Sequence, residues 1–240
     1  DIDIRLSTTP IQHGERIVMR VLEKNNTVLD LKQLGFEGQV LSHLEDLAKR
    51  KHGVLYVTGP TGHGKTTTLF AVLHKINNPD KMIITVEDPV EYEIQGISQI
   101  QVNSKIDLSF AIALRSILRQ NPDVVMVGET RDQETAEMAI NASLTGHFVL
   151  STLHTNDAAS APTRLIDMGV QPFLISSSLV GVLAQRLIRV LCDTCKKPLK
   201  ITDFHRNLLG QDTIIPADAT IFEPNGCARC GGTGYSGRTC

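Results

Sequence analysis

The sequence has little that would tie it to nucleic acid or to a lipid bilayer. Its 240 residues carry 24 Lys and Arg against 26 Asp and Glu, a formal net charge of −2, so no direct nucleic-acid partner is expected. It contains no apolar run long enough to span a bilayer and no secretory signal peptide. Tryptophan is absent and aromatic residues make up 4%. The 41% of hydrophobic residues suffices for one large or two smaller globular units.

Both ends of the sequence lie inside patterned segments. Asp1 begins within a strand-like alternation and without a methionine, and Cys240 ends in mid-segment. We therefore expect a fragment of a longer protein.

A glycine-rich stretch at residues 59–66 fits the pattern G-x-x-x-x-G-K-[ST] of a phosphate-binding loop. Glycines let backbone N–H groups wrap phosphates, Lys65 reaches the β- and γ-phosphates, and the Thr66 hydroxyl ligates Mg²⁺. A buried strand at 54–57 and a helix at 66–73 surround the loop, which disfavours the alternative of a turn that binds nothing. The residues expected to contact the nucleotide here are Gly59, Pro60, Thr61, Gly62, His63, Gly64, Lys65, Thr66 and Thr67.

Acidic residues follow two predicted strands, 82–86 and 124–127. Ligand groups in open α/β sheets collect beyond the carboxyl ends of strands, so Glu87 is the leading candidate to orient or activate water, although a solvated turn is an alternative. The second strand resembles a Walker B motif in which Gly128 replaces the usual Asp. Glu129 is then expected to hold Mg²⁺ through water or to polarise the attacking water. Which of the two glutamates activates water stays open.

Two histidines bracket the predicted strand 148–152. His154 lies just past its end, where it can contact the nucleotide and sense the γ-phosphate. His147 lies at its start, so the two have different roles. A purely structural role is an even alternative for His147 and a weaker one for His154.

The cysteines form two C-x-x-C pairs, Cys192 with Cys195 and Cys227 with Cys230. Such pairs are typical of a closed tetrahedral Cys₄ zinc site. Two disulfides or a redox pair are the alternatives, and disulfides are rare in a reducing cytosol. Cys240 is unpaired, and no role is expected for it.

The remaining pattern is that of strands alternating with helices. Further strands are expected at 97–102 and helices at 39–50, 108–119, 133–144, 158–168 and 173–191, which indicates a mostly parallel sheet with helices on both faces. Residues 1–24 are expected to form a β-hairpin that turns between Ser7 and Gly14, followed by a polar connection at 25–34.

Arginines lie both in the hairpin and near the catalytic strands. Arg5 and Arg20 are on the polar sides of the hairpin strands, where solvation is the default interpretation. Four other arginines lie nearer the catalytic strands and could neutralise phosphate charge, and spacing alone does not choose among them. They are Arg115, Arg119, Arg131 and Arg164.

Taken together, these motifs resemble the secretion ATPases of the type II secretion and type IV pilus systems. The resemblance covers nearly the whole chain and is carried by residues 59–68, 85–91, 121–132, 145–157 and 184–187. The four paired cysteines are similar to the assembly-type members, and residues 176–187 are most similar to the type II secretion branch.

The resemblance implies an α/β fold with a RecA-like P-loop NTPase core at residues 31–190. Residues 1–30 would be the tail of a PAS-like α+β domain with its linker. Residues 191–240 would be a tetracysteine zinc-binding subdomain, truncated before a C-terminal helical subdomain. His63 departs from the family, which usually has Ser there.

The implied function is a cytoplasmic hexameric ATPase that uses ATP, Mg²⁺ and Zn²⁺ to drive pseudopilus assembly in type II secretion. It would sit peripherally at the inner membrane through platform and cytoplasmic-domain proteins of the machine. Arg5 and Arg20 match family positions that reach the nucleotide, as catalytic groups, from the preceding domain. The alternatives are a type IV pilus assembly or DNA-transfer ATPase, and a non-hydrolysing docking scaffold.

Overall fold

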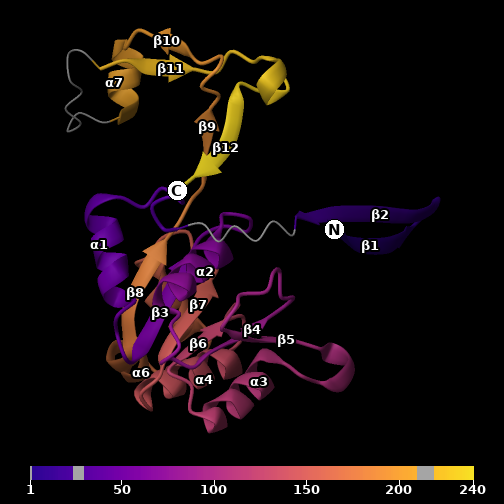
Figure 1. Cartoon of the computed structure of the whole chain (residues 1–240), viewed down its shortest axis with the longest axis vertical. Coiled ribbons are helices and arrows are strands. Elements are labelled where there is room, and N and C mark those ends of the chain that lie inside the picture. Colours follow the sequence, from indigo (N-terminus) through magenta and orange to yellow (C-terminus); the bar gives the residue numbers. More distant parts are fainter. Residues whose placement is uncertain (1, 24–29, 210–218) are drawn as a thin grey trace. The chain divides into compact units, whose positions relative to one another are not determined.

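The computed structural model describes residues 2–23, 30–209 and 219–240 (Figure 1). The chain divides into two compact units, Asp1–Arg186 and Leu187–Cys240. Part of the predicted polar connection, residues 25–29, lies outside the described residues. No helix in the described part of the chain combines the length and the apolar character needed to cross a membrane.

The N-terminal segment is a β-hairpin of β1 (Ile2–Ile11) and β2 (Gly14–Glu23). The predicted turn between Ser7 and Gly14 is longer than the observed one, because the strands remain paired as far as Thr8 with Ile17 and Ile11 with Gly14. The β-branched threonines at 8 and 9 favour the extended chain, and Pro10 is tolerated in a two-stranded ribbon where one edge of each strand is free.

The larger unit is built on a six-stranded sheet in the order β5-β4-β6-β7-β3-β8. Every neighbouring pair is parallel, which confirms the predicted α/β architecture. The strands are β3 (Gly53–Thr58), β4 (Ile83–Glu87), β5 (Ser98–Gln101), β6 (Val124–Val127), β7 (Phe148–Leu153) and β8 (Leu179–Ala184). The strands β3, β4, β6 and β7 are wholly buried, as their continuous apolar runs require. Their carboxyl ends meet at one edge of the sheet.

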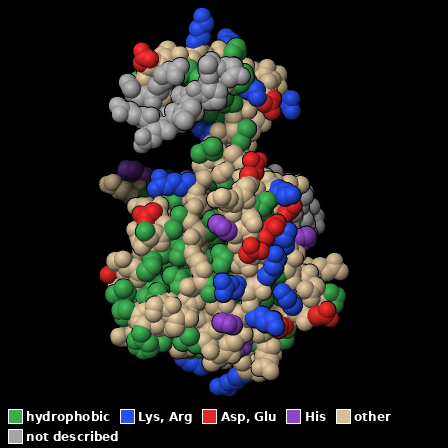
Figure 2. Space-filling model, turned by 90° about the vertical axis from the view of Figure 1, so that its left-hand side faces the viewer, with side chains coloured by type: hydrophobic (Ala, Val, Ile, Leu, Met, Phe, Trp, Pro, Cys, Tyr) green, Lys and Arg blue, Asp and Glu red, His purple; other side chains and the backbone are tan. Residues whose placement is uncertain are grey.

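Helices cover both faces of this sheet (Figure 1). They are α1 (Gly38–Leu47), α2 (Lys65–Ile76), α3 (Phe110–Ile117), α4 (Gln133–Leu144), α5 (Ser160–Asp167) and α6 (Pro172–Ser178). Alternate strand residues such as Tyr56 and Val125 join the buried cluster with Leu114 of α3 and Ile140 of α4. On the face of the larger unit that Figure 2 presents, hydrophobic side chains gather in a broad patch.

The expectation of a helix over residues 173–191 is wrong beyond Ser178. There the chain enters β8 and then β9 (Ile188–Leu191). Ser177 and Ser178 bond back to carbonyls of the preceding turn, which competes with the helical ladder. The following Val-Gly-Val stretch suits a strand instead, and Gly181 lets the backbone approach Leu47, whose Cδ1 would lie 2.8 Å from an added Cβ.

The smaller unit contains two antiparallel ribbons. β9 pairs with β12 (Tyr235–Thr239), β10 (Lys197–Leu199) pairs with β11 (Ile221–Glu223), and α7 spans Asp203–Leu209. Among the described residues of this unit only Cys192 and Gly234 are buried. An apolar core of that size does not hold such a unit together, so another source of stability is required.

Candidate nucleotide-binding site

The loop between β3 and α2 has the backbone that its glycines permit. Gly59, Gly62 and Gly64 have φ angles of 142°, 77° and 75°, values that residues with a side chain rarely adopt. Gly64 is the N-cap of α2 and supplies no side-chain hydrogen bond. The first N–H groups of α2 are therefore available to an anion at the positive end of the helix dipole.

Lys65 is held across this loop. Its side chain is 8% exposed, and Nζ donates to the carbonyl oxygens of Gly59 at 2.9 Å and of Pro60 at 3.1 Å. Burial lowers the pKa of Lys65, and the negative charge of Glu129 opposes that shift. The ammonium group thus lies over the loop, where the motif requires a cation.

Other loop residues predicted to contact nucleotide line the same turn. Thr66 and Thr67 are half-buried in the first turn of α2, and Pro60 and His63 are half-buried in the loop. Thr61 is exposed at its tip. The hydroxyl of Thr66 is therefore in the first turn, where the motif places a magnesium ligand.

Glu129, just past β6, is the centre of a charged cluster. Arg131 Nη2 lies 2.5 Å from Glu129 Oε1, and His154 Nε2 lies 3.8 Å from Glu129 Oε2. Burial and the charge of Lys65 lower the pKa of His154, so its imidazole is mainly neutral at pH 7. The fold thus brings three predicted residues, Lys65, Glu129 and His154, into one site. Of the four undecided arginines, Arg131 is the one paired with Glu129 in the described residues.

Glu87 ends β4 as a buried carboxyl group, 2% exposed. Thr85 Oγ1 and Gln99 Nε2 donate to its Oε1, whereas Oε2 has no hydrogen-bond partner among the described residues. Burial raises the pKa of Glu87 and the charge of Glu91 adds to the shift, while the two hydrogen bonds oppose it. One oxygen of this buried carboxyl group is therefore left without a hydrogen bond in the described part of the chain.

Gly128 explains why the usual Walker B aspartate is missing. Its N–H donates to Val86 O at 2.8 Å, and an added Cβ would lie 3.2 Å from that oxygen and 3.5 Å from Glu87 Cα. The ends of β4 and β6 approach so closely that a larger residue would crowd the backbone. The close approach places Glu87 and Glu129 at the same edge.

Hydroxyl groups tie the strand ends together, a feature that sequence reasoning missed. Thr58 Oγ1 accepts from the Thr155 N–H at 2.8 Å, and Thr152 Oγ1 donates to Gly128 O at 2.8 Å. Thr130 and Ser151 also share a hydrogen bond of 2.9 Å. The concentration of Ser and Thr at strand ends was the signal that could have indicated these cross-links between β3, β6 and β7.

His147 lies at the opposite edge of the sheet from this site. Its Nδ1 is 2.8 Å from Ala142 O, at the carboxyl end of α4. His147 therefore contacts the end of a helix. The side chains of Arg5 and Arg20 are not described, although the two residues are paired directly across the hairpin.

The four paired cysteines converge in the smaller unit. All five cysteines are free, and the sulfur atoms of the four lie within 4.8 Å of one another. Cys192 and Cys227 sulfurs are 4.0 Å apart, and those of Cys195 and Cys230 are 3.9 Å apart. Tetrahedral coordination with Zn–S bonds of about 2.3 Å requires sulfur separations of about 3.8 Å. Because the N–H of Cys227 donates to Cys230 Sγ, the pKa of that thiol is lowered to about 6. The donor set fits a thiolate-bound metal ion.

The parallel sheet, the glycine-rich loop with its lysine and the acid-bearing strand ends define a P-loop nucleotide-binding core. Residues 1–240 match the family model described as "Type II/IV secretion system protein", and the chain belongs to that family. The resemblance to secretion ATPases that the motifs indicate is thereby confirmed.

Individual relatives agree with the family. The chain is 54% identical over 238 residues to "Type II secretion system protein E" of Aeromonas hydrophila. It is 55% identical over 238 residues to "Type II secretion system ATPase E" of Vibrio cholerae serotype O1. Each alignment covers 99% of this chain and 47% of the relative, so the chain spans about half the length of these relatives.

Solved structures share the fold. The pilus retraction motor PilT with bound ADP superposes with a TM-score of 0.67 and 36% identity, over 78% of this chain and 55% of that one. The VirB11 ATPase of Brucella suis, in complex with sulphate, has a TM-score of 0.52 and 22% identity over 75% of this chain and 65% of that one. The second likeness is one of fold alone.

Proposed function

We propose that this chain is the ATP-hydrolysing core of a cytoplasmic motor that drives pseudopilus assembly in type II secretion. The observation that carries the proposal is the convergence of Lys65, Glu129 and His154 beside the phosphate loop. A cation, an acid and a neutral imidazole at a helix N-terminus are what phosphoryl transfer needs, since its catalysis is mainly positioning and charge stabilisation.

Each residue then has a defined task. The loop N–H groups and Lys65 hold the β- and γ-phosphates, and His154 donates a hydrogen bond to the γ-phosphate. Thr66 and Glu129 would hold Mg²⁺, which supplies neutralisation of phosphate charge when bound. Glu87 positions water and accepts its proton as the water oxygen attacks the γ-phosphorus, while the bond to the ADP oxygen breaks. A raised pKa suits this role, because a general base works best near the operating pH.

The smaller unit takes a structural zinc ion in this proposal. Cys192, Cys195, Cys227 and Cys230 would hold Zn²⁺ as a closed set of four thiolates. Metal binding in such units contributes about 10–16 kcal/mol in small peptides, which offsets the scarcity of buried apolar residues.

The whole protein is proposed to act as a homohexamer at the inner membrane, bound to platform and cytoplasmic-domain proteins of the secretion machine. Arg5 and Arg20 would reach the nucleotide from a PAS-like domain and stabilise the transferred phosphate. Type II secretion is preferred over pilus assembly and DNA transfer because the two relatives described above carry type II names. Pseudopilin and secretin genes beside this gene would support that choice.

A phosphate-release assay with ATP and Mg²⁺ tests the proposal. The chain should release phosphate, and Lys65→Ala should release none and bind nucleotide far more weakly, because the phosphates lose the loop cation. Thr202→Ala, at an exposed site in the smaller unit, is a control that should keep the wild-type rate. Tight ATP binding by the wild-type chain without any phosphate release would favour the alternative of a docking scaffold.

A further inference from the structure

Gln185, the residue after β8, is buried against the phosphate loop. Its side chain is 4% exposed, and both ends of the amide are satisfied. Oε1 accepts from Thr68 Oγ1 at 2.7 Å, and Nε2 donates to His63 O at 2.8 Å. The amide thus joins the crest of the loop to the first turn of α2.

The backbone of Gln185 holds the beginning of the same loop. Its N–H donates to Thr58 O at 2.8 Å. Its carbonyl oxygen would lie 2.2 Å from a Cβ at Gly59, so only glycine fits there. One residue therefore contacts the loop at its start, at its crest and at the helix that follows.

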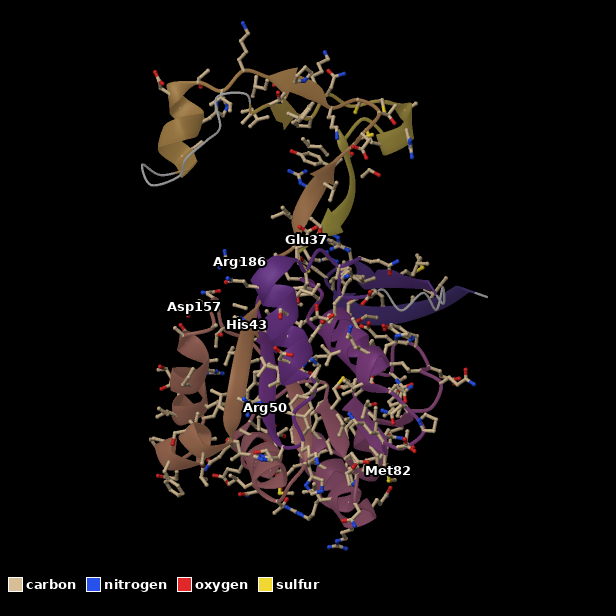
Figure 3. All side chains as sticks on the ribbon, turned by 60° about the vertical axis from the view of Figure 1, so that its left-hand side comes forward. Glu37, His43, Arg50, Met82, Asp157 and Arg186 are labelled. Carbon is tan, nitrogen blue, oxygen red and sulfur yellow. The ribbon has the colours of Figure 1, made fainter. Side chains whose placement is uncertain are left out.

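Gln185 is also two residues from Leu187, where the smaller unit begins. The intervening Arg186 donates from Nη2 to Asn156 O at 3.4 Å, and Figure 3 shows Arg186 next to Asp157. The end of β8 is thereby fixed to the core on two sides. A displacement of this segment must therefore either move the phosphate loop with it or break the hydrogen bonds of the Gln185 side-chain amide.

We propose that Gln185 is a positioning residue that couples occupancy of the phosphate loop to the ordering of the first strand of the cysteine unit, residues 187–191. The inference rests on the proposed nucleotide binding. Because coupling between two sites is reciprocal, movement of that strand also changes nucleotide affinity.

The test compares Gln185→Met with the wild-type chain. Methionine keeps the approximate volume and removes both side-chain hydrogen bonds, and Gln120→Met is the matched control at an exposed position. We expect the Kd for ADP to rise about tenfold, since a buried hydroxyl and carbonyl lose their partners. The decisive measurement is hydrogen exchange of the backbone amides in the presence of ADP. The ADP concentration is set so that the same fraction of each protein carries ADP. ADP should slow exchange at both 60–66 and 187–191 in the wild type and control, but only at 60–66 in Gln185→Met.

The results of this experiment distinguish the coupling through Gln185 from the proposed nucleotide binding. Equal slowing at 187–191 in Gln185→Met and wild type overturns the coupling while leaving nucleotide binding intact. If Gln185→Met does not fold, Gln185→Glu replaces it, since the carboxylate still accepts from Thr68 but repels His63 O. Unchanged slowing at 187–191 in Gln185→Glu likewise overturns the proposal. A wild-type chain that binds no ADP refutes the proposed function, and the coupling falls with it.

Discussion

Replacing Glu87 by glutamine should remove activity and increase stability at the same time. The amide keeps the shape of the side chain, and its oxygen can still accept from Thr85 and Gln99 as Oε1 does now. It cannot accept a proton from water. Losing a general base slows a reaction by about 10²–10⁴-fold, so phosphate release should fall by that factor. Binding of ADP, which depends on the loop, should change little.

The gain in stability follows from the burial of the Glu87 carboxylate. Oε2 is buried and has no partner in the described part of the chain, and burial raises the pKa of the group. An unpartnered buried polar group costs about 1–3 kcal/mol, and a charged one costs more. The amide nitrogen of Glu87→Gln would also lack a partner there, but it carries no charge, so the exchange should stabilise the fold by the difference, about 1–2 kcal/mol. For a domain of this size that corresponds to about 2–8 °C in Tm.

The contribution of Glu87 to the stability of the fold depends on pH with a definite sign. Because the folded pKa of Glu87 is raised, the folded state binds more protons than the unfolded one between the two pKa values, and stability falls as pH rises through that interval. Below the unfolded pKa of about 4.3 the carboxyl group is neutral in both states and the cost is absent. The Tm difference between Glu87→Gln and wild type should therefore be small below a pH of about 4.3 and grow as the pH rises above it.

Differential scanning calorimetry at several pH values, together with phosphate release, measures both effects. Glu93→Gln is the control, an exposed glutamate nearby whose replacement should leave both quantities unchanged. Wild-type turnover in Glu87→Gln would show that another group activates water. A lower Tm than wild type at pH 7 would show that the buried charge is compensated.

Other substitutions separate the remaining roles. Lys65→Ala should abolish phosphate release and weaken ADP binding measured by fluorescence titration; near-native turnover contradicts the loop assignment. Glu129→Gln should still bind ATP but hydrolyse it more slowly. A filter-binding assay measures the bound ATP, and phosphate release measures the hydrolysis. Metal analysis should find about one zinc per chain, and Cys195→Ser should lower this content and expose the smaller unit to proteolysis. In assembled rings, Arg5→Ala or Arg20→Ala should lower turnover about 10³-fold without changing the Tm of the nucleotide-free protein; unaffected turnover would refute their catalytic role.

Local motifs made the centre of the site predictable. The phosphate loop requires its glycines, Lys65 and Thr66 within eight consecutive positions, so this local sequence pattern is enough to predict the geometry of the loop. Glu87 and Glu129 could be placed because parallel strands bring their carboxyl ends to one edge, and the strands were evident as short apolar runs. The cysteine pairs likewise specify a four-sulfur cluster by spacing alone.

The contacts that hold the site together were not predictable in the same way. Thr58 meets Thr155 at a separation of 97 residues, and nothing in either segment alone indicates the other. The salt bridge between Arg131 and Glu129 depends on how the chain turns after Glu129, and spacing in the sequence left four arginines equivalent. Helical periodicity misled over residues 179–184, because pairing with β3 outweighs local propensity there, and over 188–191, which pair with β12.

Gln185 gives the clearest case of a site residue set by register. β8 pairs with β3 such that Val54 lies opposite Leu179 but Leu55 lies opposite Gly181, a shift of one residue. Thr58 then pairs with Ala184, and the next N–H, that of Gln185, reaches Thr58 O. Without the shift, Ala184 would take that place, and its methyl group cannot bridge His63 and Thr68. The shift is possible because Gly53 has no side chain, since an added Cβ would lie 2.3 Å from Val180 Cγ1. A glycine ahead of the phosphate loop thus determines which side chain at the end of β8 reaches that loop.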